Sequence, residues 1–150
     1  MENGKTEGGM LISQIHQISQ RIWNSILKNY NLQDLSGTRG RIIFAVWKTD
    51  NIPIKELVKK TSLDKATLTG IIDRLERDGF IIRSHNPQDK REIIISRTGK
   101  DEIFKTKIPA ASDEQNALFY KDFSQEEIFT FEKMLKKILK NCKDAEEKLI

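Results

Sequence analysis

The chain contains a single cysteine, Cys142, among 150 residues. One cysteine excludes an intrachain disulfide and a zinc site built from thiolates. Cysteine scarcity is typical of proteins in a reducing compartment, so we expect a cytoplasmic protein. Cys142 follows Ile138 by one helical turn on the apolar side of the last expected helix. We predict that it is buried there as a small hydrophobic residue.

Long hydrophobic runs are also missing. No segment approaches the roughly 18 apolar residues of a membrane span, and residues 1–9 lack the apolar stretch of a signal peptide. We therefore expect no membrane contact. Residues 1–9 are polar and glycine-rich, which predicts a disordered tail.

Residues with catalytic or metal-binding chemistry are scarce. His16 and His85 are the only histidines and lie in different expected elements, which makes a poor metal set. Residues 98–100, Thr-Gly-Lys, look like the end of a phosphate-binding loop, but Ile94 occupies the place of its first glycine. No spaced nucleophile, histidine and acid stand out. The sequence therefore predicts no enzyme activity, no metal and no cofactor.

The charge that is present is unevenly distributed. Hydrophobic residues make up 37% and charged residues 32% of the chain, which suits one compact domain. Residues 53–100 contain eleven Lys and Arg against seven acids, which equals the whole net charge of +4. A local basic excess suits a polyanion such as nucleic acid, although a mixed solvated surface has the same composition.

Helical patterns flank this basic block. Apolar residues recur every three or four positions in residues 10–30, and residues 99–119 are compatible with a helix that Pro109 kinks or breaks. Ser124 and Glu127 have the spacing of a capping box for a terminal helix. That helix is expected to place six apolar residues inside: Ile128, Phe131, Met134, Leu135, Ile138 and Leu139.

The middle of the chain has the pattern of a helix-turn-helix. After a helix over residues 38–48, Pro53 suits the first turn of the next helix, because its missing N–H would be unpaired there. Residues 61–63 form a short connection, and Asp64 is a suitable N-cap for the following helix. Gly79 can end that helix in a left-handed conformation.

A β-hairpin is expected directly after this helix. Residues 80–83 and 92–96 are rich in strand-forming residues, and the turn-like residues 85–90 separate them. In a winged helix-turn-helix, the second helix enters the major groove and the hairpin, or wing, contacts the minor groove or phosphates. Three residues at the tip have suitable chemistry: Asp89, Lys90 and Arg91.

The start of the second helix could contact base edges. Lys65 can donate to guanine, Thr67 and Thr69 can form hydrogen bonds, and Ala66 can contact a thymine methyl group. Small residues, Gly70 included, allow close approach. Arg74 and Arg77 lie further along and suit phosphates. A solvated polar face is the simpler interpretation of an isolated helix, and the adjacent hairpin favours DNA binding.

The wing tip has two interpretations. Asp89 stands two residues before Arg91, and its carboxylate can hold the guanidinium extended for insertion into a narrow minor groove. Alternatively, the two form a surface ion pair worth about 0–1 kcal/mol. The position directly after the candidate reading helix favours insertion.

These residues resemble the MarR family of regulators, most specifically through two segments at a characteristic distance, DRLERDGFI (Asp73–Ile81) and NPQDKR (Asn86–Arg91). Further matches are Leu57, residues 64–69, Ile93, Ile95 and Thr98. The resemblance covers most of the chain. It departs at Gly70, where the family often has a basic or polar side chain, and at Arg97 and Asp101, which replace the leucine and glycine that usually follow the wing.

The resemblance implies a mainly α fold with a small β-hairpin wing, a winged helix-turn-helix flanked by dimerisation helices. Residues 10–35 would form the N-terminal dimerisation helix, residues 36–98 the DNA-binding region and residues 99–150 the C-terminal dimerisation helices. The homodimer would bind a pseudo-palindromic operator in double-stranded DNA, with Arg91 in the minor groove and Asp89 orienting it. Most members are repressors, and some are released by a small-molecule effector.

Aromatic residues on the first two helices suggest where an effector would bind. In MarR-like dimers these helices wall a pocket, and Trp23, Tyr30, Phe44 and Trp47 lie on them. Core packing is the simpler role. With Arg39 or Arg41 at its edge, such a pocket suits a small aromatic or anionic molecule. A different function for the whole chain is a winged-helix protein-interaction module that binds an acidic partner.

Overall fold

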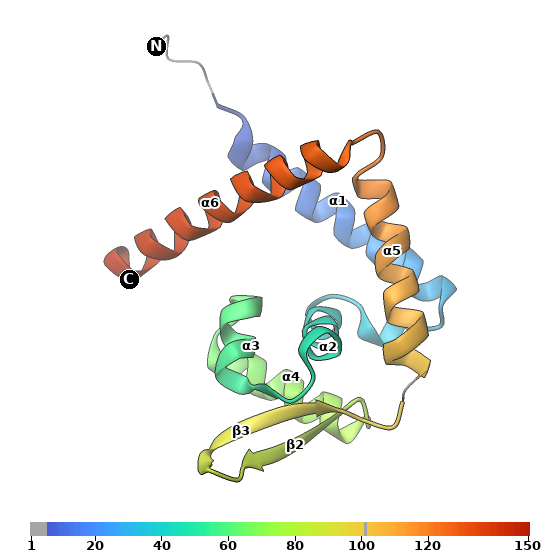
Figure 1. Ribbon diagram of the computed structural model, residues 1–150, viewed down its shortest axis with the longest axis vertical. Coiled ribbons are helices and arrows are strands. Elements are labelled where there is room, and N and C mark those ends of the chain that lie inside the picture. The colour runs from blue at the N-terminus through green and yellow to red at the C-terminus, as the bar shows by residue number, and fades with distance from the viewer. Residues whose placement is uncertain (1–5, 101) are drawn as a thin grey trace. The chain divides into compact units, whose positions relative to one another are not determined.

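The computed structural model describes residues 6–100 and 102–150. These residues form two compact units, the first ending at Gln115 and the second spanning Asn116–Ile150. The fold is mainly α-helical with a small antiparallel sheet, as the sequence predicts (Figure 1). The helices are α1 (Gly8–Asn29), α2 (Thr38–Thr49), α3 (Ile54–Thr61), α4 (Lys65–Arg77), α5 (Ile108–Phe119) and α6 (Gln125–Leu149), and the strands are β1 (Ile52–Pro53), β2 (Ile81–Asn86) and β3 (Asp89–Arg97).

Helix α4 begins and ends where its capping residues predict. The Asp64 carboxylate accepts hydrogen bonds from the backbone N–H of Thr67 at 2.8 Å and from the Thr67 hydroxyl at 2.6 Å. At the other end Gly79 has a φ of +80°, and its N–H donates to the Glu76 carbonyl at 3.0 Å. The face between these caps buries four apolar residues: Leu68, Ile71, Ile72 and Leu75.

The wing contains a strand that the sequence analysis missed. Strand β1 pairs with β3, so the sheet has three strands in the order β1-β3-β2. Pro53 lies in β1 with extended backbone (φ −62°, ψ 144°) and precedes α3. Its predicted place in the first helical turn is therefore wrong by one residue. A strand of two residues carries no alternation by which it can be recognised.

The β2–β3 hairpin is longer than predicted. The strands span residues 81–86 and 89–97, so most of the predicted turn 85–90 is strand and only Pro87 and Gln88 form the turn. The residues at the ends of both strands have polar side chains, so a search for alternating hydrophobic residues does not detect this part of the strands. The backbone ladder forms irrespective of side-chain polarity.

The core of the first unit joins helices α1 to α4 with the sheet. Leu57, Leu68, Ile72 and Ile95 are completely buried in it. Gly40 permits the close approach of α2 to the segment before it, because a Cβ there would lie 2.3 Å from the Leu35 carbonyl oxygen. The first unit thus holds the winged helix on a core of its own side chains.

The chain after the wing begins with a π-helical turn, Ile103–Lys107, which leads directly into α5. The helix is not broken at Pro109, and the predicted irregularity is the π-helical turn just before it. Pro109 lies in the first turn of α5, where its missing N–H is tolerated. Phe104 and Ile108 are buried in the core of the first unit. The division between the two units falls within α5. Asp101 lies outside the described residues.

The second unit exposes most of its apolar side chains. Ser124 and Glu127 form the predicted capping box of α6, with reciprocal hydrogen bonds of 2.7 and 3.1 Å. None of the 25 residues of α6 is buried, and of the six predicted to be inside, Met134, Ile138 and Leu139 are exposed. Cys142 is exposed too. Its predicted burial is wrong for the single chain, since no other element of its unit covers that face.

The start of the chain was predicted to be a disordered tail over residues 1–9, followed by a helix from residue 10. Helix α1 begins at Gly8, two residues earlier than the expected start at residue 10, while residues 1–5 of the predicted tail lie outside the described residues. In the part of the chain that the structure describes, no helix combines the length and apolar character needed to cross a bilayer.

Candidate nucleic-acid interface

The outward face of α4 carries the predicted base-contacting residues. Lys65, Ala66 and Thr67 are exposed, while Thr69 and Gly70 are half-buried. The Thr67 hydroxyl is held by Asp64, and the Thr69 hydroxyl donates to the Lys65 carbonyl at 2.8 Å. The helix therefore offers the Lys65 ammonium group, the threonine methyl groups and the free lone pairs of both hydroxyls.

Gly70 has no steric reason to be glycine. A Cβ built on it meets no atom within 4 Å. A glycine inside a helix costs about 0.8–1.0 kcal/mol relative to alanine. The packing of the chain therefore does not require a glycine at this position.

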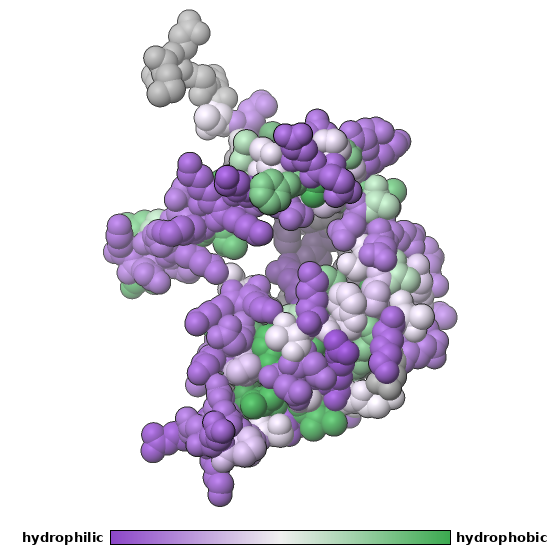
Figure 2. Space-filling model, in the orientation of Figure 1, coloured by the Kyte–Doolittle hydropathy of each residue, from purple (hydrophilic) through white to green (hydrophobic). Residues whose placement is uncertain are grey.

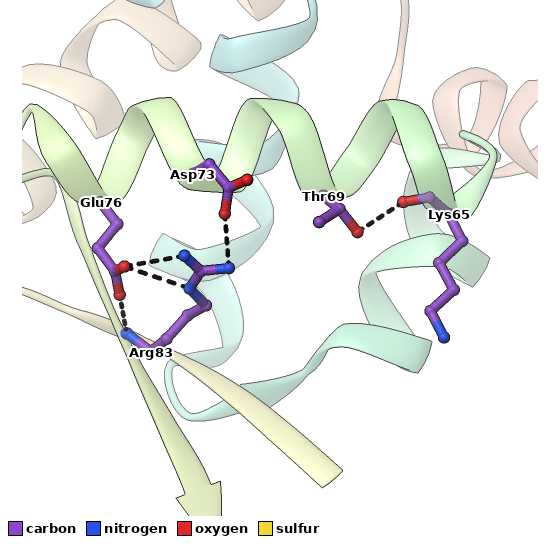
Figure 3. A network of polar contacts seen from close by, with 5 residues as sticks. All are labelled: Lys65, Thr69, Asp73, Glu76 and Arg83. Carbon is purple, nitrogen blue, oxygen red and sulfur yellow. Dashed lines mark hydrogen bonds and ion pairs between the residues drawn. The ribbon is translucent and has the colours of Figure 1, made fainter. Parts of the chain in front are cut away.

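Arg83 of β2 fastens α4 to the wing (Figure 3). Its guanidinium lies 2.7 Å from the Asp73 carboxylate and 3.0 Å from Glu76, and its backbone N–H donates to Glu76 at 3.0 Å. These hydrogen bonds lower the pKa of Glu76 and raise that of Arg83. Lys65, Thr69 and Asp73 lie along the same side of α4 (Figure 3), so Arg83 sets the orientation of that side relative to the sheet.

A hollow of about 310 Å³ lies between the start of α4 and the wing. Lys65, Asp89 and Arg91 line it together with Lys55 and Glu92 of α3 and β3. The structure thus brings Lys65 of the helix and Asp89 and Arg91 of the wing to one concave surface. The wing tip projects as a hydrophilic point at the lower left of Figure 2.

Lys55 and Glu92 were not predicted as site residues. The Lys55 ammonium lies 3.0 Å from the Glu92 carboxylate, and the Asn86 amide donates to Glu92 at 2.6 Å. Both contacts lower the pKa of Glu92. The residues are 37 positions apart in sequence, and no local pattern indicates that they meet.

Asp89 acts on Arg91 differently from the prediction. Its carboxylate accepts from the backbone N–H of Arg91 at 3.0 Å. Within the described part of the chain, the two side chains form no ion pair. Asp89 therefore fixes the backbone at the tip, and the exposed guanidinium of Arg91 is left to solvent or to a ligand.

The two arginines predicted to contact phosphates lie on exposed positions near the end of α4. Arg77 lies 3.7 Å from Asp78. Asp78 also pairs with Arg39 of α2 at 2.8 Å, and the Arg39 hydrogen bond is the main reason that the pKa of Asp78 is lowered. Arg39 is thus engaged in structure, whereas Arg74 remains accessible.

Two of the predicted effector residues line the same hollow. Trp23 and Arg41 line a hollow of about 140 Å³ with Gly37 and Gln115. The buried Oε1 atom of Gln115 has no hydrogen-bond partner within the described part of the chain. The other three lie elsewhere: the Tyr30 hydroxyl donates to Glu114 at 3.1 Å, and the rings of Phe44 and Trp47 pack 5.4 Å apart against the core.

Within residues 6–100 and 102–150, no three His, Cys, Asp or Glu residues converge as a metal site would require.

Arg97, which departs from the expected pattern after the wing, is a structural residue. Its guanidinium donates to the Trp47 carbonyl at the end of α2, and its backbone N–H donates to Asp50 at 2.9 Å.

Comparison with known proteins agrees with this geometry. The family model described as MarR family matches residues 35–93. The chain is 30% identical over 128 residues to the HTH-type transcriptional repressor YetL of Bacillus subtilis, covering 83% of this chain and 76% of YetL. It is 25% identical to the HTH-type transcriptional regulator MgrA of Staphylococcus aureus, covering 88% and 86%. Among solved structures, a MarR mutant from E. coli complexed with operator DNA superposes with a TM-score of 0.72 at 26% identity, covering 87% and 92%.

Proposed function

The chain belongs to the MarR family and is a DNA-binding transcriptional regulator; from this premise we propose that it is a repressor that binds a pseudo-palindromic operator as a homodimer. One observation carries the proposal: Lys65 of α4 and Arg91 of the wing line the same hollow. A duplex that received α4 in its major groove would therefore meet the wing at the neighbouring backbone or minor groove. A regulator works where the genome lies, which supports the cytoplasmic location.

The contacts divide by chemistry. We assign Lys65, Ala66, Thr67, Thr69 and Gly70 to base edges in the major groove. Arg74 and Arg77 are assigned to phosphates, which position the protein without reading sequence. Lys90 and Arg91 are assigned to the minor groove, with Asp89 holding the backbone that carries Arg91.

The exposed apolar side chains of the two units support a homodimer. In α1, Leu11, Ile15 and Ile18 are 42–50% exposed. In α6, Met134 and Leu139 are exposed by 60% and 50%. Soluble proteins rarely leave such patches in water, and a second copy is the simplest cover. Bivalent binding to two half-sites would then raise operator affinity.

Selection of duplexes from a random pool tests the DNA-binding mode. We expect a palindromic duplex with half-sites about one helical turn apart to outcompete random DNA by about 10³-fold or more. Arg91→Ala should weaken operator binding whatever bases lie under α4, and Lys65→Ala should change base preference. Equal affinity for all duplexes would contradict the proposal.

We further propose that the hollow at Trp23 and Arg41 binds a small anionic effector that releases the operator. The Arg41 guanidinium and the Trp23 ring fit a carboxylate on a small ring. The Gln115 amide nitrogen already donates to the Ser19 carbonyl, so its unpaired Oε1 atom fits a hydrogen-bond donor on the same ring. A thermal-shift screen of aromatic carboxylates tests this, with Arg41→Ala as the variant that should lose the shift and Arg21→Ala as the control. An effector must also lower operator affinity, since it acts only by favouring one dimer state.

A further inference from the structure

The wing tip contains an extra stretch of chain. Strand pairing runs regularly from Ile81–Arg97 to His85–Ile93, and the next pair is Asn86–Asp89. Three residues of β3, Lys90, Arg91 and Glu92, therefore lie opposite no residue of β2. Pro87 at the first position of the turn favours a type I or II turn, which splays the two strands, and the extra residues accommodate this. The two wing residues proposed to contact DNA, Lys90 and Arg91, thus lie where the regular hydrogen-bond ladder of the hairpin is interrupted.

Side chains replace the missing ladder contacts in this stretch. The Nδ1 atom of His85 lies 2.8 Å from the Lys90 carbonyl oxygen. Asp89 holds the N–H of Arg91, and Asn86 holds the Glu92 side chain. Because a carbonyl only accepts hydrogen bonds, the His85 tautomer that makes this contact carries its proton on Nδ1. The peptide group between Lys90 and Arg91 is therefore gripped from both ends, its carbonyl by His85 and its N–H by Asp89.

We propose that His85 is a positioning residue of the wing: it orients the peptide group from which Arg91 departs, and it acts on DNA through Arg91, whose role rests on the proposed function. His85, Lys90 and Arg91 are all exposed. Water can replace a lost contact to the Lys90 carbonyl, so the hydrogen bond adds little to folding. It restricts the freedom of the tip before DNA arrives, and preorganisation of this kind increases affinity.

Three substitutions at His85 separate the two ring nitrogens. Asparagine places an amide N–H₂ close to the position of Nδ1, whereas glutamine places it close to that of Nε2. We expect His85→Ala and His85→Gln to weaken operator binding by about three- to tenfold, the worth of one hydrogen bond. His85→Asn should restore most of the affinity. The thermal midpoint should change little in all three.

A double-mutant cycle with Arg91→Ala tests whether His85 acts through Arg91. At a salt concentration where Arg91→Ala still binds, adding His85→Ala should cause little further loss. His16→Asn, at an exposed position on α1, is the matched control and should bind as the unmodified chain does. The salt dependence of binding should have the same slope for His85→Ala as for the unmodified chain, because no phosphate contact is removed.

Three results would overturn the role of His85. Rescue by glutamine but not asparagine would mean that Nε2 makes the important contact. An equal loss from His85→Ala with and without Arg91 would mean that His85 contacts DNA itself. Unchanged affinity in His85→Ala, while Arg91→Ala weakens binding, would remove His85 from the wing mechanism alone. Unchanged affinity in Arg91→Ala would instead contradict the proposed function.

Discussion

The winged helix and the C-terminal unit treat their apolar residues in opposite ways. In the winged helix, Leu57, Leu68 and Ile72 have no exposed surface. In the C-terminal unit, the long helix α6 has an equally regular apolar face and buries none of its residues. The first region completes its core within one chain, and the second leaves its apolar face open to the partner copy that we propose. The amphipathic pattern of a helix therefore identifies its apolar face. It does not tell whether that face packs within the same chain or against another chain.

Truncation in the core of the winged helix should give the largest effect on folding. Leu68→Ala removes a completely buried side chain of α4 and should lower the free energy of unfolding by about 2–5 kcal/mol. Because Leu68 lies inside one chain, the dimer dissociation constant of the folded protein should stay the same. Urea denaturation and analytical ultracentrifugation measure the two quantities. A changed dissociation constant with normal stability would reverse the comparison.

A charge on the apolar face of α6 should weaken dimerisation and leave the stability of the winged helix nearly unchanged. Ile138 is 44% exposed in the single chain, so Ile138→Glu should barely change the stability of the winged helix and should weaken dimerisation. Loss of bivalent binding should lower operator affinity by about 10²-fold or more. Lys133→Glu, on the charged side of the same helix, is the control for added negative charge. Normal dimerisation of Ile138→Glu would mean that this face has no partner copy.

Two glycines of the winged helix differ in the same way, because Gly70 faces open space and Gly40 lies against the Leu35 carbonyl. Gly70→Ala fills open space and should raise the free energy of unfolding by about 0.8–1.0 kcal/mol, yet weaken operator binding if DNA approaches α4 closely. Gly40→Ala should destabilise the fold, because its Cβ would meet the Leu35 carbonyl. Chemical denaturation and operator titration report the two effects. Tighter operator binding by Gly70→Ala would remove close approach as the reason for this glycine.

The smallest expected effect is a difference in pH response between the two units. Hydrogen bonds from Thr67 lower the pKa of Asp64, so the stability that this group adds is present above its unfolded pKa and is lost as pH falls through its folded pKa. In the second unit, burial and the Glu132 hydrogen bond raise the pKa of Tyr120 to about 12. The stability linked to Tyr120 is therefore lost as pH rises from 10 to about 12.

Thermal unfolding as a function of pH measures both limbs. Asp64→Asn should flatten the acid limb and leave the alkaline limb in place. Tyr120→Phe should do the reverse. Identical pH profiles for the two variants would show that the pH responses of the units cannot be told apart.

Local features of the fold were predictable from the sequence, and long-range ones were not. Asp64, Gly79 and Ser124 fix the ends of α4 and α6 through atoms within a few residues, so their roles can be deduced from sequence spacing. The pairing of Ile52 with Ile95 joins positions 43 residues apart. A two-residue strand that depends on such a partner carries no pattern of its own.

The same distinction applies to the site. The chemistry of Lys65 and Arg91 could be predicted, because charge and position after a cap are local properties. The clamp made by Arg83 could not, since it requires knowing that β2 passes beside α4. The effector residues were grouped by their helices. In the structure Trp23 and Arg41 line one hollow, and the rings of Phe44 and Trp47 pack against each other and the core.

The clamp at Arg83 and the pair Arg39–Asp78 have a mechanical consequence. The first joins the side of α4 to the sheet and the second joins its C-terminal end to α2, so a turn or slide of α4 relative to the wing or to α2 would break these ion pairs. In the regulator that we propose, a displacement of α2 would then be passed through these contacts to α4 and the wing. A small displacement near α2 would be amplified at the far tip of the wing, and the spacing of two such heads would decide whether both still fit one duplex.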